Sequence, residues 1–290
     1  METLPNSLPA KVGVLGGGRM GAGIAHAFLV NGSDVLVVER DEASAIAARE
    51  RIESAAAKSI ERGATDANLD EMASRLRVSV DYADFGDRSL VIEAVPEIWD
   101  LKVSSLQKVE ENLGADAILA SNTSSLSMSG LATELQRPEN FLGLHFFNPV
   151  PASTLIEVVI AKQSSEAVIE AARGWVAGLG KTAVVVNDAP GFASSRLGVA
   201  IALEAMRMVE EGVASAQDID NAMVLGYKHP TGPLKTTDIV GLDVRLGIAE
   251  YLHGTLGERF APPQILRDLV AAGHLGRKTG KGFYDWNDAT

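Results

Sequence analysis

The sequence predicts an α/β protein whose largely parallel sheet carries a helical hairpin insertion and is followed by an all-α carboxy-terminal domain. Three observations support this fold class. Short apolar runs alternate with helical patterns up to about Asn187, a turn cluster follows at Asp188-Ala189-Pro190-Gly191, and only helical periods lie beyond it. We therefore predict two domains, residues 1–187 and residues 188–290.

Eight short apolar runs are predicted to be the strands of the sheet. Several are nearly uninterrupted by polar residues and rich in Val or Ile, as strands buried on both faces must be. Helical stretches separate most of them, which favours a parallel sheet flanked by helices. The predicted strands are Val12–Leu15, Val35–Val38, Leu76–Val80, Leu90–Ile92, Ala117–Ala120, Phe141–Leu144, Leu155–Ile160 and Ala183–Val186.

The segment between the second and third predicted strands has room for two helices where one would suffice. Ala43–Arg62 is rich in Ala, Arg and Glu, which favour helix. Gly63 then breaks the pattern, and Asn68 can cap a second helix that begins near Leu69. We therefore predict a helical hairpin that projects from the sheet.

Beyond the domain boundary the sequence shows helical periods and no convincing strand. Glycines follow the first two predicted helices and mark their ends. The predicted helices are Leu197–Glu211, Ala216–Leu225, Leu234–Leu252 and Pro263–Ala272.

The composition of the 290 residues excludes several classes of function. Hydrophobic residues make up 46% and charged residues 22%, a balance typical of globular proteins. The absence of cysteine excludes disulfides, thiolate metal sites and thiol catalysis. No two of the 5 histidines have the spacing of a metal motif, so no metal is predicted. The net charge of −12 repels nucleic acid and anionic membranes, so neither is expected as a partner.

Targeting and membrane-spanning segments are also not expected. Met1–Ala10 holds no basic residue and no apolar run of signal-peptide length. The sequence has no stretch of about 18 uncharged apolar residues that could cross a bilayer. We therefore predict a cytoplasmic protein.

A glycine-rich turn predicts a Rossmann-type dinucleotide site. Gly16, Gly18 and Gly21 form a G-x-G-x-x-G pattern between a strand and a helix, where the backbone can approach a pyrophosphate. The next strand ends at Glu39, whose carboxylate can accept both ribose hydroxyls of an adenosine. The alternative is a structural turn followed by a solvated acid. Because Glu39 repels a 2′-phosphate, NAD is predicted over NADP, although Arg40 could hold such a phosphate.

Polar residues at two further strand ends predict a catalytic pair. Ser121–Ser125 and His145–Pro149 both follow strands, where ligands bind in open parallel sheets. A carboxylate inside an apolar strand, such as Glu157, is costly unless paired, and His145 would satisfy it. His145 can then accept an alcohol proton, Glu157 can fix its tautomer, and Ser124 can hold the substrate oxygen. The alternatives are a buried structural histidine and a serine run that caps the next helix.

Six sequence segments point to one family. They are VGVLGGGRMGAGIAHA, ASNTSSL, GLHFFNPVP, the PGF turn, HPTGPL and GRKTGKGFYDW. In this order, from about Lys11 to Trp286, they resemble the L-3-hydroxyacyl-CoA dehydrogenase family, most closely its bacterial 3-hydroxybutyryl-CoA members. The resemblance implies reversible, NAD-dependent oxidation of an L-3-hydroxyacyl-CoA to the 3-ketoacyl-CoA. It also implies that the carboxy-terminal domain closes over the acyl-CoA thioester and forms most of a homodimer.

The resemblance further implies roles for individual residues. The family's catalytic histidine falls on His145, its partner glutamate on Glu157 and its active-site serine on Ser124. Residues that line the nicotinamide end fall on Asn122 and Asn148. The remaining NAD contacts fall on Gly16, Gly18, Gly21, Glu39, Glu97, Lys102 and Lys278.

The predicted helical hairpin resembles the arm that touches the adenosine end of CoA in this family. Ser54 aligns with a family contact there, and Lys58 and Arg62 are expected to add further contacts. Basic residues at this position suit an anionic ligand in an otherwise acidic protein.

Two departures from the family pattern leave the acyl substrate open. Ser195 stands where the family has an asparagine that reaches the substrate, and Thr154 replaces a lysine after the NPVP turn. The same redox chemistry could therefore act on a dicarboxylic hydroxyacyl-CoA, an acyl carrier protein thioester or a free hydroxy acid. A further alternative is a nucleotide-binding protein without catalysis.

Overall fold

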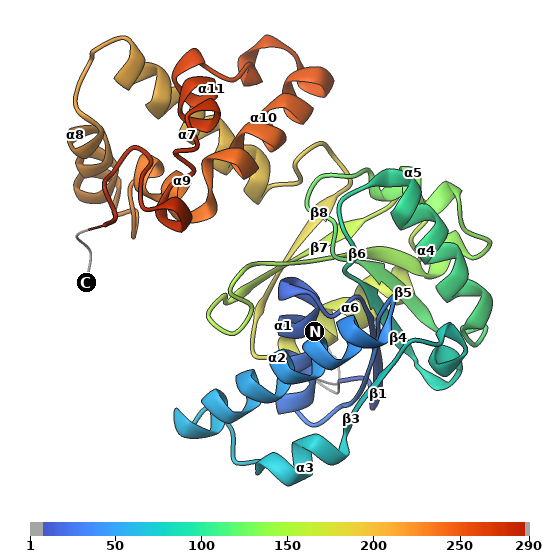
Figure 1. The fold of residues 1–290 in the computed structure, drawn as a ribbon. Coiled ribbons are helices and arrows are strands. Elements are labelled where there is room, and N and C mark those ends of the chain that lie inside the picture. Colours follow the sequence, from blue (N-terminus) through green and yellow to red (C-terminus); the bar gives the residue numbers. More distant parts are fainter. Residues whose placement is uncertain (1–7, 288–290) are drawn as a thin grey trace. The chain divides into compact units, whose positions relative to one another are not determined.

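The computed structural model describes residues 8–287, and Figure 1 shows their arrangement. The chain divides into two compact units between Asp188 and Ala189, one residue after the predicted boundary. Most of Met1–Ala10, where no signal peptide is predicted, lies outside the described residues. Each unit is described below by itself.

Within the described residues, the first unit contains one eight-stranded sheet in the order β3-β2-β1-β4-β5-β6-β7-β8. Neighbouring strands are parallel except β6 and β7, which pair antiparallel. The predicted fold class is confirmed. The strands are β1 (Lys11–Leu15), β2 (Asp34–Val38), β3 (Leu76–Ser79), β4 (Leu90–Glu93), β5 (Ile118–Ser121), β6 (Phe141–Phe146), β7 (Leu155–Ile160) and β8 (Thr182–Asn187).

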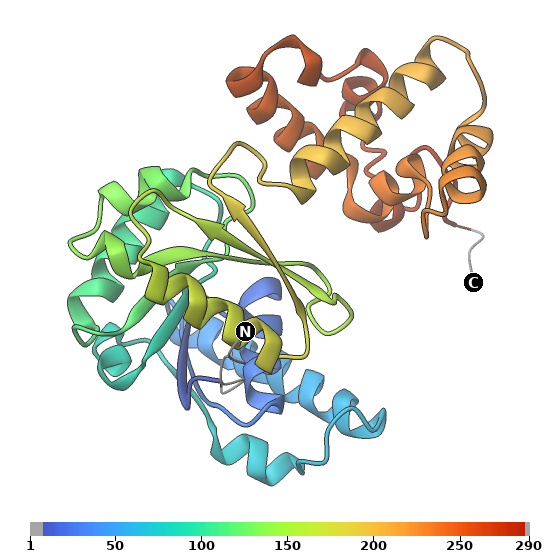
Figure 2. The same cartoon turned by 180° about the vertical axis from the view of Figure 1, so that it is seen from behind.

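Helices cover both faces of this sheet (Figures 1 and 2). Helices α1, α2 and α6 pack on one face over a continuous apolar cluster, and α4 and α5 lie on the other. Burial of this apolar surface is the main force that holds the layers together. The helices are α1 (Arg19–Val30), α2 (Glu42–Glu61), α3 (Leu69–Ser74), α4 (Trp99–Asn112), α5 (Met128–Thr133) and α6 (Glu166–Gly178), with short 3-10 turns η1 (Tyr82–Asp87) and η2 (Pro138–Asn140).

Helices α2 and α3 form a hairpin beside the edge strand β3 (Figures 1 and 2). The side chain of Asp41 accepts the backbone N–H of Ser44 and caps α2. Asn68 likewise accepts the N–H of Glu71 and caps α3, as its position in the sequence predicts. Gly63, with φ at +63°, makes the turn between the two helices.

The second unit is helical within its described residues, apart from two isolated β-bridges near its end. The prediction of a single helix over Leu234–Leu252 is wrong. Gly241 adopts a φ of +112°, which no residue in an α-helix has, and it separates two helices there. The helices are α7 (Ser194–Glu210), α8 (Ala216–Asn221) with its π-helical continuation η3 (Ala222–Gly226), α9 (Pro233–Val240), α10 (Leu242–Leu256) and α11 (Gln264–Ala271), with short 3-10 turns η4 (Glu258–Phe260) and η5 (Arg277–Thr279).

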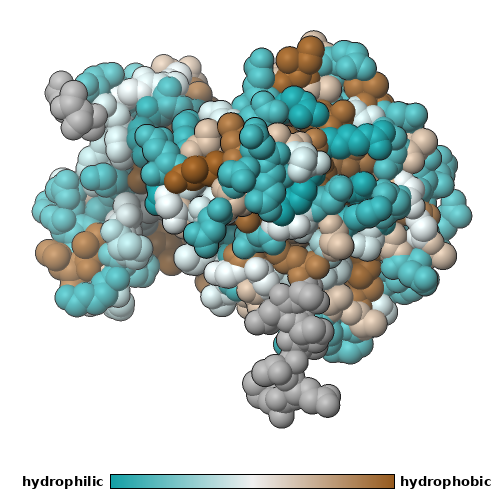
Figure 3. Space-filling model, turned by 90° about the horizontal axis from the view of Figure 1, so that it is seen from below, coloured by the Kyte–Doolittle hydropathy of each residue, from teal (hydrophilic) through white to brown (hydrophobic). Residues whose placement is uncertain are grey.

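The surface is largely hydrophilic on the face shown in Figure 3, with apolar residues in scattered patches. Within residues 8–287, no helix combines the length and the apolar composition that crossing a bilayer requires. Each unit buries a cluster of large apolar side chains instead.

Candidate active site

The glycine turn lies between β1 and α1 and has little room for side chains. Gly16 has a φ of +88°, a conformation that residues with a Cβ rarely adopt. A Cβ on Gly21 would lie 1.7 Å from the carbonyl oxygen of Gly16, so only glycine fits there. The backbone at the start of α1 is therefore open to a pyrophosphate, as NAD binding requires.

Replacing Gly21 by alanine is expected to weaken NAD binding at least about 10-fold, because the turn must move to relieve the overlap. The dissociation constant for NADH, measured by fluorescence titration, tests this. Gly114→Ala is the matched control, since nothing lies within 4 Å of the Cβ it would add. A Gly21→Ala protein with the melting temperature and the NADH affinity of wild type would contradict the conclusion that only glycine fits at this position.

Glu39 lies at the end of β2, beside the glycine turn. Its Oε1 accepts the backbone N–H of Gly17 at 2.7 Å. Arg51, on α2, donates from Nη1 to the carbonyl oxygen of Gly17 at 3.2 Å. The position of Glu39 suits recognition of a ribose, and Arg51 is a neighbour of the turn that the sequence analysis missed. In a helix rich in Ala, Arg and Glu, the sequence does not distinguish an arginine that contacts the glycine turn from one that is solvated.

His145 and Glu157 meet because of the register of β6 and β7. These antiparallel strands place the two residues directly opposite each other, so their side chains share one face. His145 Nδ1 lies 2.7 Å from Glu157 Oε2. Glu157 is fully buried, and 6% of His145 is exposed. A carboxylate held on Nδ1 fixes the tautomer and the orientation of the imidazole and leaves Nε2 for a substrate.

Residues after β5 and β6 connect the ends of these strands. Asn122 Oδ1 accepts the backbone N–H of Phe146 at 2.8 Å. Asn148 is exposed and precedes Pro149 through a cis peptide bond. Lys181, immediately before β8, donates from Nζ to the carbonyl oxygen of Val150 at 2.8 Å. These bonds hold the segment between β6 and β7 in place next to His145.

A buried charge cluster lies at the carboxyl ends of β4 and β5. Lys102 Nζ donates to Glu93 Oε1 at 2.7 Å and lies 3.2 Å from Glu97 Oε2. Ser121 Oγ donates to the other oxygen of Glu93 at 2.6 Å. Lys102 and Glu93 are 1% and 0% exposed, so their charges must be satisfied within this cluster.

Glu97 links this cluster to the serine run. Its Oε1 accepts the backbone N–H of Ser124 at 2.9 Å and that of Ser125 at 3.1 Å. Burial would raise the pKa of Glu97, but the charge of Lys102 and a hydrogen bond from Thr123 lower it below its usual value overall. Ser124 is therefore held by an ionised carboxylate, next to the predicted cofactor site.

Comparison with known proteins places these features in one family. The model for the 3-hydroxyacyl-CoA dehydrogenase NAD binding domain matches residues 11–189, and that for the C-terminal domain matches residues 191–286. The chain belongs to the 3-hydroxyacyl-CoA dehydrogenase family. The protein is thus an NAD-dependent oxidoreductase, and the family, the enzyme class and the cofactor predicted from the sequence are confirmed.

Named relatives align over nearly the whole chain. The 3-hydroxybutyryl-CoA dehydrogenase of Mycobacterium tuberculosis is 39% identical over 280 residues, which cover 95% of this chain and 98% of that protein. The mitochondrial hydroxyacyl-coenzyme A dehydrogenase of Rattus norvegicus is 37% identical over 284 residues, with 95% and 90% covered. The crystal structure of (S)-3-hydroxybutyryl-CoA dehydrogenase from Ralstonia eutropha has a TM-score of 0.91 and 37% identity, with 97% and 100% covered.

The other residues predicted for this 3-hydroxyacyl-CoA dehydrogenase site lie on α2, at its carboxyl end, or in the second unit. Ser54, Lys58 and Arg62 are exposed, on α2 and at its carboxyl end. Ser195 is on α7, and Lys278 pairs with Asp243 through contacts of 2.6 and 2.7 Å. Ser195 and Lys278 belong to the second unit, and their roles stay predictions.

Glu93 is the buried acid that the sequence analysis missed in this 3-hydroxyacyl-CoA dehydrogenase. The reasoning that singled out Glu157, a carboxylate inside an apolar strand, applies equally to Glu93 at the end of Leu90–Glu93. That signal was present in the sequence. What the sequence did not show is that Lys102 would reach Glu93 from the neighbouring helix.

Proposed function

We propose that this protein oxidises an L-3-hydroxyacyl-CoA to the 3-ketoacyl-CoA reversibly, with His145 as the general base and a short acyl chain such as 3-hydroxybutyryl. The observation that carries this proposal is the buried contact between His145 and Glu157. It lies in a sheet whose first turn is built for a dinucleotide. The relatives named as 3-hydroxybutyryl-CoA dehydrogenases support the short acyl chain.

The reaction needs a group that takes the hydroxyl proton while hydride leaves the same carbon. NAD, when bound, supplies the hydride acceptor. With Nδ1 held by Glu157, His145 exchanges this proton through Nε2 and returns it in the reverse direction. Ser124 donates or accepts a hydrogen bond at the C3 oxygen, and its backbone is positioned by Glu97.

The residues that would hold NAD follow from the same geometry. Gly16, Gly18 and Gly21 would receive the pyrophosphate at the start of α1. Glu39 would hold the adenosine ribose at the end of β2. Asn122 and Asn148 would line the nicotinamide end, and the family resemblance adds Glu97, Lys102 and, from the second unit, Lys278 as further NAD contacts.

A panel of 3-ketoacyl thioesters tests the proposal. We expect NADH oxidation with acetoacetyl-CoA, little oxidation of NADPH, and falling kcat/KM for long acyl chains. A free hydroxy acid and an acyl carrier protein thioester serve as the competing substrates, because Ser195 and Thr154 depart from the family. Turnover of the free acid, with none of any CoA thioester, would reject the proposed substrate class.

We further propose that the protein is a cytoplasmic homodimer that associates through residues 188–290. Large apolar side chains exposed on the second unit support this association, since such surfaces mark interfaces. They include Leu197, Ile201, Val213, Leu225, Tyr227, Ile239, Val240 and Val244. Light scattering after gel filtration should give twice the 30.6 kDa chain mass.

A further inference from the structure

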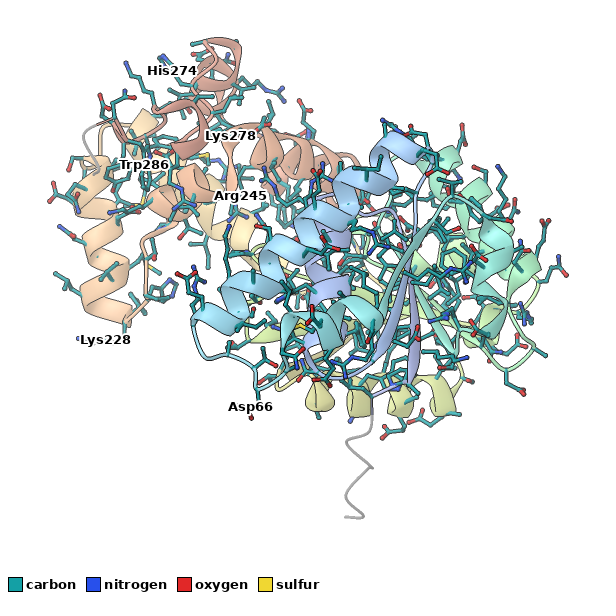
Figure 4. The ribbon with its side chains drawn as sticks, turned by 60° about the horizontal axis from the view of Figure 1, so that its bottom comes forward. Asp66, Lys228, Arg245, His274, Lys278 and Trp286 are labelled. Atoms are coloured by element: carbon teal, nitrogen blue, oxygen red, sulfur yellow. The ribbon has the colours of Figure 1, made fainter. Side chains whose placement is uncertain are left out.

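Two arginines, Arg19 and Arg51, adjoin the glycine turn of the first unit. Arg19 is the first residue of α1 and directly follows Gly18. Arg51 is on α2, a helix that packs against α1 (Figures 1 and 4). Its Nη1 donates to the carbonyl oxygen of Gly17 at 3.2 Å. Two different helices therefore each bring one positive charge to the same short turn.

The packing of α2 on the turn determines where the Arg51 side chain begins. Ala48 is buried and lies three residues before Arg51, so the two share a face of α2. A Cβ on Gly17 would lie 2.4 Å from the Cβ of Ala48, so the helix and the turn are as close as glycine allows. The hydrogen bond to Gly17 is the one that the Arg51 guanidinium makes within residues 8–287, and it uses one of five N–H donors.

The charges of both arginines are unbalanced within the part of the chain that the structure describes. Neither forms an ion pair there, whereas Arg49, on the same helix as Arg51, pairs with Glu53 at 3.4 Å. The position of Arg19 is unfavourable by itself, because the free amides of the first helical turn are partly positive and favour acids. Both side chains are exposed, so an anion from solution can reach them.

The geometry of the turn favours a diphosphate as this anion. The amides at the start of α1 are the usual ligands of a diphosphate, and a guanidinium adds paired N–H donors that match phosphate oxygens. Glu39 accepts the N–H of Gly17 at 2.7 Å, and its carboxylate would repel a phosphate on the adenosine ribose. NAD carries the diphosphate without that second phosphate.

We propose that Arg19 and Arg51 both bind the diphosphate of NAD and add their charges to the amides of the glycine turn. This inference rests on the proposed placement of NAD at that turn. CoA also contains a diphosphate, but the contact of Arg51 with Gly17 favours the dinucleotide. In a chain with a net charge of −12, two cations at this place offset the repulsion that an anionic cofactor meets.

The affinity for NADH of Arg19→Met, Arg51→Met and the double variant, measured by fluorescence titration, tests the proposal. Each single change is expected to weaken binding about 5- to 10-fold, the scale of one charge-assisted hydrogen bond. Added salt should weaken NADH binding to wild type more steeply than to the double variant. With saturating NADH, kcat should stay within about twofold of wild type, because these residues bind the cofactor and take no part in proton transfer. Arg49→Met, on the same helix, is the matched control.

Fragments of the cofactor identify which part of it the two arginines contact. ADP-ribose contains the diphosphate and adenosine lacks it, so the double variant should lose affinity for ADP-ribose and keep its affinity for adenosine. Equal loss for both fragments, which a distorted turn would give, would overturn the proposal. Unchanged NADH affinity in the double variant, or an effect confined to the KM for acetoacetyl-CoA, would overturn it as well. Failure of wild type itself to bind NADH would instead reject the proposed placement of NAD.

Discussion

Replacing His145 by glutamine is expected to lower kcat by at least about 100-fold, the usual scale for loss of a general base. Glutamine can still occupy the space next to Glu157 and donate a hydrogen bond to it, so the buried carboxylate stays satisfied. It cannot accept and return a proton near neutral pH. Turnover of acetoacetyl-CoA, followed by NADH absorbance, measures the effect.

NADH binding separates a chemical role of His145 from a structural one. The glycine turn and Glu39 do not depend on His145, so His145→Gln should bind NADH about as tightly as wild type. Its melting temperature should also stay close to that of wild type. Turnover near the wild-type level in this variant would reject His145 as the base.

Replacing Lys102 by methionine is expected to destabilise the first unit by about 3–5 kcal/mol. The reason is that Lys102 is the positive partner of both the buried carboxylate of Glu93 and the carboxylate of Glu97. For a unit of this size, that loss corresponds to a fall in melting temperature of roughly 6–20 °C. NADH binding should weaken as well, since Glu97 would no longer be held ionised beside the serine run. Differential scanning calorimetry and NADH titration measure the two effects.

Lys108→Met provides the matched control for this cluster. Lys108 is on the same helix, α4, and is exposed, so its loss should cost little. Adding Glu93→Gln to Lys102→Met should recover part of the lost stability, since glutamine can still accept a hydrogen bond from Ser121 without a buried charge. Equal melting temperatures for Lys102→Met and Lys108→Met would show that Lys102 does not stabilise the first unit through Glu93 and Glu97.

The elements that local chemistry specifies were predictable from the sequence. Each of the eight apolar runs overlaps one of the strands, and Asn68 caps α3 because a side-chain oxygen at that position satisfies a free helix amide. The break at Gly241 was not predicted, because a single glycine inside a helical period is also tolerated without a break. Its positive φ is a property of the folded second unit, which the sequence pattern does not show.

The candidate site was predictable where a residue type alone limits its surroundings. Glu157 needed a partner because it lies in an apolar strand, and His145 was the titratable group at a neighbouring strand end. Contacts made by residues on other elements of the fold were not predictable. Lys102 reaches Glu93 from α4, and Arg51 reaches Gly17 from α2, through packing that has no local signature.

The antiparallel pairing of β6 with β7 makes the proposed chemistry sensitive to insertions and deletions. Side chains alternate between the faces of a strand, so a slip of one residue would turn Glu157 away from His145 and leave a charge among apolar neighbours. The connection between these strands can therefore vary in composition more freely than in length. Lys181 donates hydrogen bonds to the carbonyl oxygens of Val150 and Ser153 in that connection and so restricts its length. The alignment of the proton-transfer pair therefore also depends on the residue that precedes the neighbouring strand β8.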